Sequence, residues 1–255
     1  MPQNPFIDFQ NKKVIVTGVS SGIGRAICIE LKKYNADLVL VGRDRDRLNK
    51  TAEEIDNQKN HIIVLDLSMV DNIFSTIKDS SAKIGPIYGL CHAAGVVETL
   101  PLNISSPHSI QKMIDVNLLA GLELARTLSR KDVMEKDGGS ILFIASIFGS
   151  VGIPGQIAYS ASKGGLIAAA KAMAIELARR NILVNTISPG LVKTPMTEKA
   201  FSKLSDHQRA EIEKAYPLGV GTPEDVARAA AFLLAPQNKW ITGIDLVIDG
   251  GYTAK

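Results

Sequence analysis

Two side chains in the stretch YSASK, Tyr159 and Lys163, have types and a spacing suited to proton transfer. If the stretch is helical, a separation of four positions places the phenol and the ammonium on one face. A neighbouring ammonium stabilises a phenolate and lowers the phenol pKa from its ordinary value of about 10. The pair would equally suit an interfacial ring and a solvated surface charge, so further residues are needed to indicate catalysis.

A serine upstream of this pair could supply a second hydroxyl. Ser146 ends the apolar run SILFIAS, which has the composition of a buried strand. In open α/β sheets, ligands bind beyond the carboxyl ends of the strands. We therefore expect Ser146 to lie at the edge of the sheet where a ligand would bind.

A glycine-rich turn, TGVSSGIGR at residues 17–25, lies between a predicted strand and a predicted helix. Gly18, Gly22 and Gly24 follow the order GxxxGxG. Glycine lets the backbone turn sharply and approach a pyrophosphate, while the helix N-terminus offers free N–H donors and the positive end of a dipole. The turn therefore predicts a dinucleotide site, and the alternative is an ordinary tight strand-to-helix turn.

The end of the second predicted strand bears on which dinucleotide binds. A carboxylate there would hold the ribose hydroxyls of NAD, whereas an arginine would accommodate the 2′-phosphate of NADP. The sequence LVLVGRDRD places Gly42 where the carboxylate would sit and Arg43 directly after it. This favours NADP(H) over NAD(H), and Ser20 or Ser21 could bind the same phosphate. The alternative is that Arg43 is a solvated loop charge.

Seven short apolar runs alternate with segments long enough for helices. Nearly continuous apolar strands of this kind indicate a parallel sheet covered on both faces. The sequence therefore predicts one doubly wound α/β domain over residues 1–255, a size within the range of single α/β domains. The predicted strands are VIVTG from Val14, DLVLVG from Asp37, HIIVLDL from His61, YGLCHAAG from Tyr88, SILFIAS from Ser140, ILVNTISPG from Ile182 and IDLVIDGG from Ile244.

Helices are predicted between these strands, at about residues 22–33, 44–57, 69–82, 107–135, 157–180 and 223–235. Asp44 is expected to cap the second helix, and Thr222 before Pro223 to cap the last. Residues 191–220 form a polar insertion longer than a simple connection, and we expect it to be a mobile lid.

Composition excludes several classes of protein. Hydrophobic residues make up 45% and charged residues 22% of the chain, with a net charge of +3. These values are typical of globular proteins and indicate neither a nucleic-acid nor a membrane partner. With no signal peptide or long apolar run apparent, we expect a cytoplasmic protein with reduced cysteines. The histidines are too scattered to predict a metal site: His61, His92, His108 and His207.

Together the motifs resemble the short-chain dehydrogenase/reductase family over nearly the whole chain, which implies a Rossmann fold with a seven-stranded parallel sheet. The motifs that carry the resemblance are TGVSSGIG, LDLS around Asp66, HAAG at 92–95, DVN ending at Asn117, Ser146, YSASK, SPG at 188–190 and the terminal DGG.

The resemblance implies a role for each catalytic residue. Tyr159 would protonate a carbonyl oxygen, or act as the base in the alcohol direction. Ser146 would hydrogen-bond that oxygen. Lys163 would bind the nicotinamide ribose and lower the pKa of Tyr159, and Asn117 would fix a water that links Lys163 to solvent.

The resemblance also implies a set of cofactor contacts. Read without the motifs, Asp66 is also an ordinary turn residue, Asn117 a satisfied helix amide and Thr194 the start of a helix. His92 and Ala93 depart from the pair of asparagines common in the family, and we expect His92 to be a packed strand residue. The implied contacts are Gly18, Ser20, Ser21, Gly22, Ile23, Gly24, Arg43, Asp66, Leu67, Ala94, Gly95, Tyr159, Lys163, Pro189, Gly190, Val192 and Thr194.

These observations predict an NADP-dependent oxidoreductase acting on a ketone or secondary alcohol, similar to 3-oxoacyl-acyl-carrier-protein reductases. The alternatives are an NAD-dependent alcohol, sugar or steroid dehydrogenase and a non-catalytic dinucleotide sensor. Asp137 stands where such reductases often have a basic residue, although Arg179 and Arg180 could receive an acidic carrier protein. The resemblance also implies a homodimer or homotetramer formed through the long helices.

Overall fold

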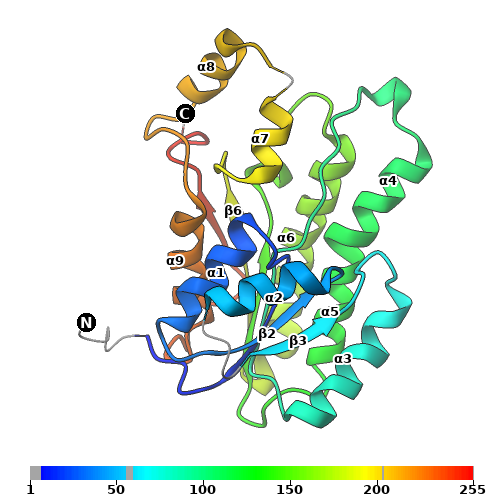
Figure 1. Cartoon of the computed structure of the whole chain (residues 1–255), viewed down its shortest axis with the longest axis vertical. Helices are drawn as coiled ribbons and strands as arrows, with labels where there is room; N and C mark the ends of the chain where they lie inside the picture. Colours follow the sequence, from blue (N-terminus) through cyan, green and yellow to red (C-terminus); the bar gives the residue numbers. More distant parts are fainter. Residues whose placement is uncertain (1–6, 56–59, 203, 255) are drawn as a thin grey trace.

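Seven parallel strands form one sheet in the computed structural model, which describes residues 7–55, 60–202 and 204–254 (Figure 1). Their order is β3-β2-β1-β4-β5-β6-β7, so the chain winds outward from β1 in both directions. The fold confirms the predicted doubly wound domain and all seven predicted strands. The strands are β1 Lys13–Thr17, β2 Asp37–Gly42, β3 His61–Val64, β4 Gly89–His92, β5 Gly139–Ile144, β6 Ile182–Pro189 and β7 Asp245–Ile248.

Apolar strands in the middle of the sheet are buried on both faces. Every residue of β5 is buried, and Cys91 of β4 lies opposite Leu142 of β5 in the register. Both cysteines of the chain, Cys28 and Cys91, are buried free thiols. Runs of branched aliphatic residues suit such strands because neither face meets water.

Helices cover the two faces of the sheet (Figure 1). One core packs α1 (Gly22–Lys32), α2 (Arg45–Glu54) and α9 (Pro223–Leu234) on one face. The other core packs α3 (Asp71–Ile84), α5 (Ala120–Leu128) and α6 (Ile157–Leu177) on the opposite face. The predicted end of the second helix at residue 57 lies outside the described residues.

Two predicted helix caps are confirmed. The Asp44 carboxylate accepts a hydrogen bond from the Arg47 N–H, 3.1 Å away. At the start of α9, the Asp225 carboxylate accepts from the Thr222 N–H at 2.7 Å, and Pro223 occupies the first helical position.

The prediction of one helix over residues 107–135 is wrong. The segment divides into α4 (Pro107–Ile114), a π-helical turn (Asp115–Leu119) and α5, which ends at Leu128. The backbone after α5 pairs with the chain before β4: the Ile87 N–H donates to the Val133 carbonyl at 2.9 Å, and the Glu135 N–H to the Ile87 carbonyl at 3.0 Å. These bonds replace the helical hydrogen bonds that would have continued α5.

The polar insertion at residues 191–220 contains two short helices, α7 (Pro195–Phe201) and α8 (Asp206–Lys214), which stand over the carboxyl end of the sheet (Figure 1). Its two ends are held together because the Gly221 N–H donates to the Leu191 carbonyl at 3.0 Å. Short 3₁₀ turns complete the fold at Leu102–Ile104, Ile147–Gly149 and Ala178–Arg180.

Candidate active site

The glycine-rich turn after β1 packs directly against the turn after β4. Gly18 has a φ of +70°, and a Cβ on it would lie 2.8 Å from the Cα of Ala94. A Cβ on Gly24 would lie 2.5 Å from the carbonyl oxygen of Gly18. Neither position has room for a side chain, so both glycines are needed for this close approach of backbone to backbone.

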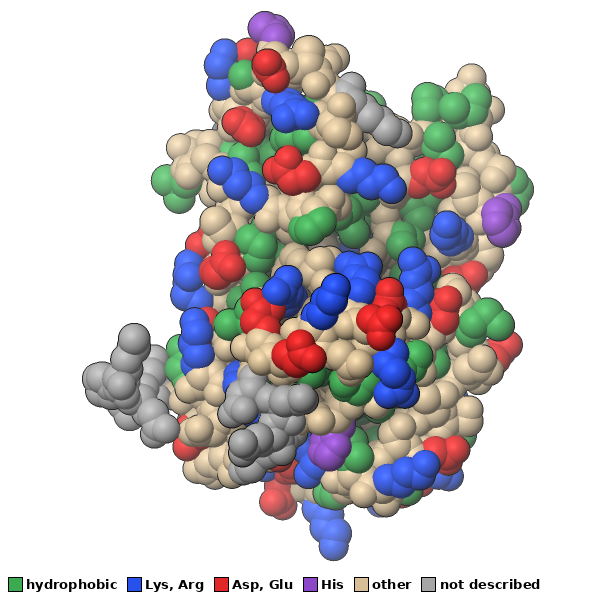
Figure 2. Space-filling view, in the orientation of Figure 1, with side chains coloured by type: hydrophobic (Ala, Val, Ile, Leu, Met, Phe, Trp, Pro, Cys, Tyr) green, Lys and Arg blue, Asp and Glu red, His purple; other side chains and the backbone are tan. Residues whose placement is uncertain are grey.

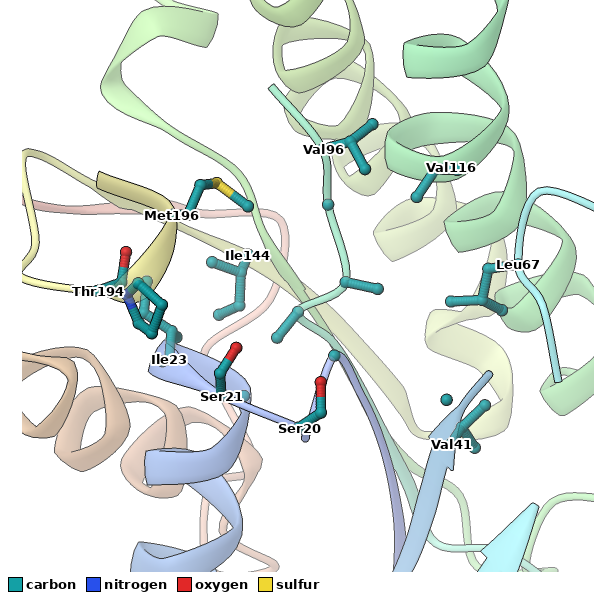
Figure 3. A pocket seen from close by; sticks show the side chains of 18 of the residues that line it. Ser20, Ser21, Ile23, Val41, Leu67, Val96, Val116, Ile144, Thr194 and Met196 are labelled. Carbon is teal, nitrogen blue, oxygen red and sulfur yellow. The ribbon is translucent and has the colours of Figure 1, made fainter. Parts of the chain in front are cut away.

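The N-terminus of α1 is open to an anion. Among the described residues, Ser21 at the cap position makes no side-chain hydrogen bond to the first turn of α1, which leaves backbone N–H groups for a ligand. Figure 3 shows Ser20, Ser21 and Ile23 lining the pocket on this side, with Thr194 and Met196 nearby. A glycine-rich turn beside free N–H donors fits the pyrophosphate of a dinucleotide.

The ends of β2 and β3 form the next part of the pocket. Gly42 and Arg43 line it at the end of β2, and Asp66 and Leu67 line it after β3. The Asp66 carboxylate accepts from the N–H and the hydroxyl of Ser68, at 2.9 and 2.8 Å. These two bonds, with a smaller contribution from the charge of Arg43, lower the pKa of Asp66 and keep it ionised.

Asn117 lies behind the pocket wall. Its side-chain oxygen accepts from the Val96 N–H at 2.8 Å, and its amide nitrogen donates to the Val96 carbonyl at 2.9 Å and to the Ser162 hydroxyl at 3.1 Å. Asn117 is therefore a satisfied helix amide, and it also lies beside Lys163. A Cβ on Gly95 would lie 3.4 Å from the Asn117 Oδ1 and 3.5 Å from the Lys163 Nζ.

Ser146, Tyr159 and Lys163 meet at the carboxyl end of β5. The Lys163 ammonium donates to the Ile144 carbonyl at 2.7 Å and lies 5.8 Å from the centre of the Tyr159 ring. Ser146 is buried, its hydroxyl accepts from the Phe148 N–H at 3.2 Å, and it lies close enough to the Tyr159 phenol to lower the phenol pKa. The fold thus brings two hydroxyls and one ammonium from separate elements to one point.

Burial controls the pKa values of the Tyr159 and Lys163 side chains. Burial raises the pKa of Tyr159, and the nearby Ser146 hydroxyl lowers it by less. Burial also lowers the pKa of Lys163 to about 8. The expected lowering of the Tyr159 pKa by Lys163 is therefore not found: loss of solvent around the phenolate is the largest influence, and the ammonium donates to a backbone carbonyl instead.

The insertion at residues 191–220 borders the pocket beside the glycine-rich turn. A Cβ on Gly22 would lie 3.2 Å from the Cγ2 of Thr194. The Thr194 hydroxyl also accepts from the Thr197 N–H at 3.2 Å, so Thr194 caps α7 as its alternative interpretation had it. Pro189, Gly190 and Val192 line the same wall.

All predicted cofactor contacts and Ser146 line one pocket of ≈ 480 Å³, and only Asn117 lies behind its wall. Sequence reasoning missed several lining residues. Arg47 could have been found, because it lies one helical turn after Arg43. Some of the others come from elements whose positions only the fold defines, among them Val96, Lys112, Val116 and Met196.

Fold and site together define an α/β enzyme that binds a dinucleotide beside a serine, a tyrosine and a lysine. Residues 18–253 match the family model described as enoyl-(acyl carrier protein) reductase. The chain is 36% identical over 250 residues to the 3-oxoacyl-(acyl-carrier-protein) reductase FabG of Rickettsia typhi, covering 96% of this chain and 98% of the relative. It is 34% identical to the FabG of Chlamydia muridarum, covering 94% and 97%.

Solved structures agree. A putative short-chain alcohol dehydrogenase from Sinorhizobium meliloti 1021 superposes with a TM-score of 0.91 at 28% identity, covering 98% of this chain and 100% of that one. A short-chain type dehydrogenase/reductase from Mycobacterium marinum gives 0.90 at 30% identity, covering 97% and 98%. The chain belongs to the short-chain dehydrogenase/reductase family and is an oxidoreductase.

Within the part of the chain that the structure describes, no helix is long and apolar enough to cross a membrane. No group of three or more His, Cys, Asp or Glu side chains among these residues is arranged to hold a metal ion. The cytoplasmic location and the absence of a metal stay predictions.

Proposed function

We propose that this protein transfers a hydride between NADP(H) and the ketone or secondary alcohol of a 3-oxoacyl thioester. The observation that carries the proposal is the meeting of Ser146, Tyr159 and Lys163 beside a cradle fit for a pyrophosphate. The names of the Rickettsia and Chlamydia relatives support the thioester. The cofactor would supply the hydride, and the protein orientation and proton control.

Each catalytic side chain has one task in this proposal. Tyr159 holds a proton at its phenolic oxygen and gives it to the carbonyl oxygen during reduction. Ser146 donates a hydrogen bond to the same oxygen as negative charge develops. Lys163 holds the ribose next to the nicotinamide. Asn117 and Lys163 both border the space beside Gly95, which would suit a water that resupplies the proton.

Two arginines support a preference for NADP(H). Arg43 and Arg47 are exposed and line the pocket at the end of β2, and blue side chains gather over this region, where α2 runs (Figure 2). A Cβ on Gly42 would lie 3.1 Å from the Cδ2 of Leu48, so a carboxylate side chain there would need Leu48 to move. The two arginine side chains could bind the 2′-phosphate of NADP(H), and a carboxylate at position 42, which would favour NAD(H), is disfavoured.

Replacing Arg43 with alanine should raise the KM for NADPH about 10- to 100-fold, because a charged hydrogen bond contributes about 1.5–3 kcal/mol. The KM for NADH should change little, since NADH lacks the 2′-phosphate. Arg45→Ala is the matched control: Arg45 is also exposed and lies outside the pocket lining. If Arg43→Ala raised the KM for NADPH and for NADH equally, the NADP assignment would be wrong. It would also be wrong if the unmodified protein had a KM for NADH at least tenfold below its KM for NADPH.

Exposed apolar side chains on the pocket lining and on the segment before α4 support an acyl substrate. Met196 lines the pocket and is exposed, and Leu102 and Ile104 are exposed on the segment before α4. Figure 2 shows hydrophobic side chains over the segment before α4. Such residues fit an acyl chain better than a sugar, which sets the proposal apart from a sugar dehydrogenase.

The name of the family model raises reduction of an enoyl double bond as a second candidate. Turnover of matched 3-oxoacyl and 2-enoyl thioesters with NADPH distinguishes the two activities, and simple ketones and secondary alcohols extend the panel. We expect turnover of the 3-oxoacyl compound, because Ser146 and Tyr159 provide two hydroxyls for one oxygen. Turnover confined to the enoyl compound would contradict this, and binding of NADPH without any turnover would favour the sensor.

A carrier protein docked at Arg179 and Arg180 could not deliver its thioester to the pocket of the same chain. Both residues end the helical region before β6, whose first residue is Ile182, so they lie at the amino edge of the sheet. The pocket lies at the carboxyl edge, and a thioester docked at these arginines would face away from it. Comparing acyl-carrier-protein and coenzyme A thioesters tests whether a carrier is recognised elsewhere.

The pH dependence of reduction should follow Lys163. Its ammonium is present below a pKa of about 8 and is lost above it, while the raised pKa of Tyr159 keeps the phenol protonated at neutral pH. We therefore expect kcat/KM to be flat near neutral pH and to fall above about pH 8 with loss of one proton. Residual activity of Lys163→Arg should lack this decline, because an arginine does not titrate there.

A homodimer or homotetramer and a mobile lid remain part of the proposal. On α6, Ile175 is 81% exposed beside exposed Ala172, whereas Ala170 and Ala174 pack on the sheet. The outer face of α6 is thus free to meet a second copy. Light scattering would measure the assembly, and hydrogen exchange over residues 191–220 with and without NADPH would measure lid closure.

A further inference from the structure

A buried histidine outside the proposed proton path lies behind the cofactor pocket. His92 ends β4 and is fully buried, and its Nδ1 lies 3.0 Å from the Thr17 hydroxyl. That hydroxyl already accepts from the N–H groups of Ala93 and Ala94, at 3.1 and 3.0 Å. A hydroxyl has two acceptor sites and one proton, so Thr17 must donate that proton to Nδ1.

The network therefore assigns the tautomer of His92. Its Nδ1 accepts from Thr17, and in the neutral ring the proton must sit on Nε2. The ring also faces the backbone of Val116 and Asn117, yet among the described residues Nε2 has no hydrogen bond of standard geometry. These two residues belong to the π-helical turn, where wider hydrogen bonding displaces carbonyls from their usual α-helical partners.

Gly121 makes room for the imidazole. A Cβ on this residue of α5 would lie 2.9 Å from the Cδ2 of His92 and 3.3 Å from its Nε2. The contact involves a ring that is fully buried and that also packs edge-on against Phe143, with ring centres 6.5 Å apart. The ring therefore has little freedom to move away, and residues 92 and 121 are sterically coupled.

We propose that His92 is a positioning residue that joins the cofactor-binding turn at 93–95 to the π-helical turn carrying Asn117, with Gly121 providing its space. One side of the ring supports Thr17, which holds the Ala93 and Ala94 amides. The other side faces the backbone that presents Asn117, whose amide in turn holds Val96. The effect on catalysis rests on the proposed function, but the coupling of His92 to Gly121 does not.

His92→Leu and His92→Asn test the positioning role. The leucine leaves the Thr17 proton without its acceptor and places an apolar side chain against the π-helical turn, whereas the asparagine can still accept from Thr17. We expect His92→Leu to raise the dissociation constant for NADPH and to lower kcat, each about tenfold, a size usual for residues that act through others. His92→Asn should restore most of the binding. Loss of thermal stability with unchanged NADPH binding and kcat in both variants would overturn the positioning role.

A double-mutant cycle tests the steric coupling. Gly121→Ala should lower the melting temperature strongly, because its Cβ meets the His92 ring. The combination His92→Asn with Gly121→Ala should be more stable than Gly121→Ala alone. Gly152→Ala is the control, since a Cβ there meets nothing within 4 Å. If the change in melting temperature of the double variant equalled the sum of the changes in the two single variants, the coupling would be overturned.

Nitrogen-15 spectra of the imidazole rings test the tautomer directly, with His92→Asn to assign the signal. We expect an unprotonated Nδ1 and a protonated Nε2, and a protonated Nδ1 would overturn the inference. If the unmodified protein bound no NADPH, the proposed function would fail. The double-mutant cycle and the nitrogen-15 spectra would still test the coupling of His92 to Gly121 and the tautomer of His92.

Discussion

Replacing Tyr159 with phenylalanine is expected to lower kcat for ketone reduction by about 10²–10⁴-fold, the usual contribution of a positioned acid or base. The substitution removes only the phenolic oxygen, so the ring still packs beside Lys163. The dissociation constant for NADPH should change less than threefold, or about 0.6 kcal/mol, because the pyrophosphate cradle lies on other elements. Steady-state kinetics and fluorescence titration measure the two quantities.

Tyr34→Phe is the matched control for the loss of a phenol. The Tyr34 hydroxyl lies 3.4 Å from Glu30, on the α1 side of the fold and outside the pocket lining. This variant should keep the kcat of the unmodified protein. If Tyr159→Phe kept it too, Tyr159 would not be the proton donor.

Lys163→Met should reduce kcat/KM by a similar factor without lowering the free energy of unfolding at neutral pH. A pKa lowered from 10.5 to about 8 means that burial disfavours the ammonium by on the order of 3 kcal/mol. The hydrogen bond to the Ile144 carbonyl offsets about 1.5–3 kcal/mol of this, and methionine can fill the space. Lys163 therefore contributes little to the free energy of unfolding, and we expect its charge to serve catalysis.

Denaturant unfolding together with turnover separates the two effects of this substitution. Lys50→Met is the control, because Lys50 is exposed on α2 and lies outside the pocket lining. It should leave both turnover and unfolding unchanged. A large loss of stability in Lys163→Met, with turnover lost only in proportion to the unfolded fraction, would make Lys163 a structural residue.

The sheet and most of the pocket could be predicted from the sequence because their signals are local. The glycines of the first turn are required by contacts such as that of Gly24 with the Gly18 carbonyl, which no other residue type permits. The strands are continuous apolar runs because both faces are buried. Parallel strands end at one edge, so the motifs after β1, β2, β4 and β5 had to meet there.

Features that depend on long-range contacts could not be predicted. The helix α5 ends at Leu128, and the chain after it forms hydrogen bonds with Ile87 that the periodicity of the helix does not reveal. The pKa of Tyr159 depends on how deeply the ring is buried, which its distance in sequence from Lys163 does not reveal. His92 was expected to be a packed strand residue, which is correct, but its bond to Thr17 required the register of β1 with β4.

The packing of α1 against α9 also has a consequence for synthesis of the chain. Ile27 and Leu31 of α1 share a core with Val226 and Ala230 of α9. Ribosomes add about 5–20 residues per second, so the roughly 190 residues from Lys32 to Pro223 take on the order of 10–40 seconds. During that time the apolar face of α1 lacks its partner. We therefore expect a nascent chain stopped before α9 to expose α1 to chaperones.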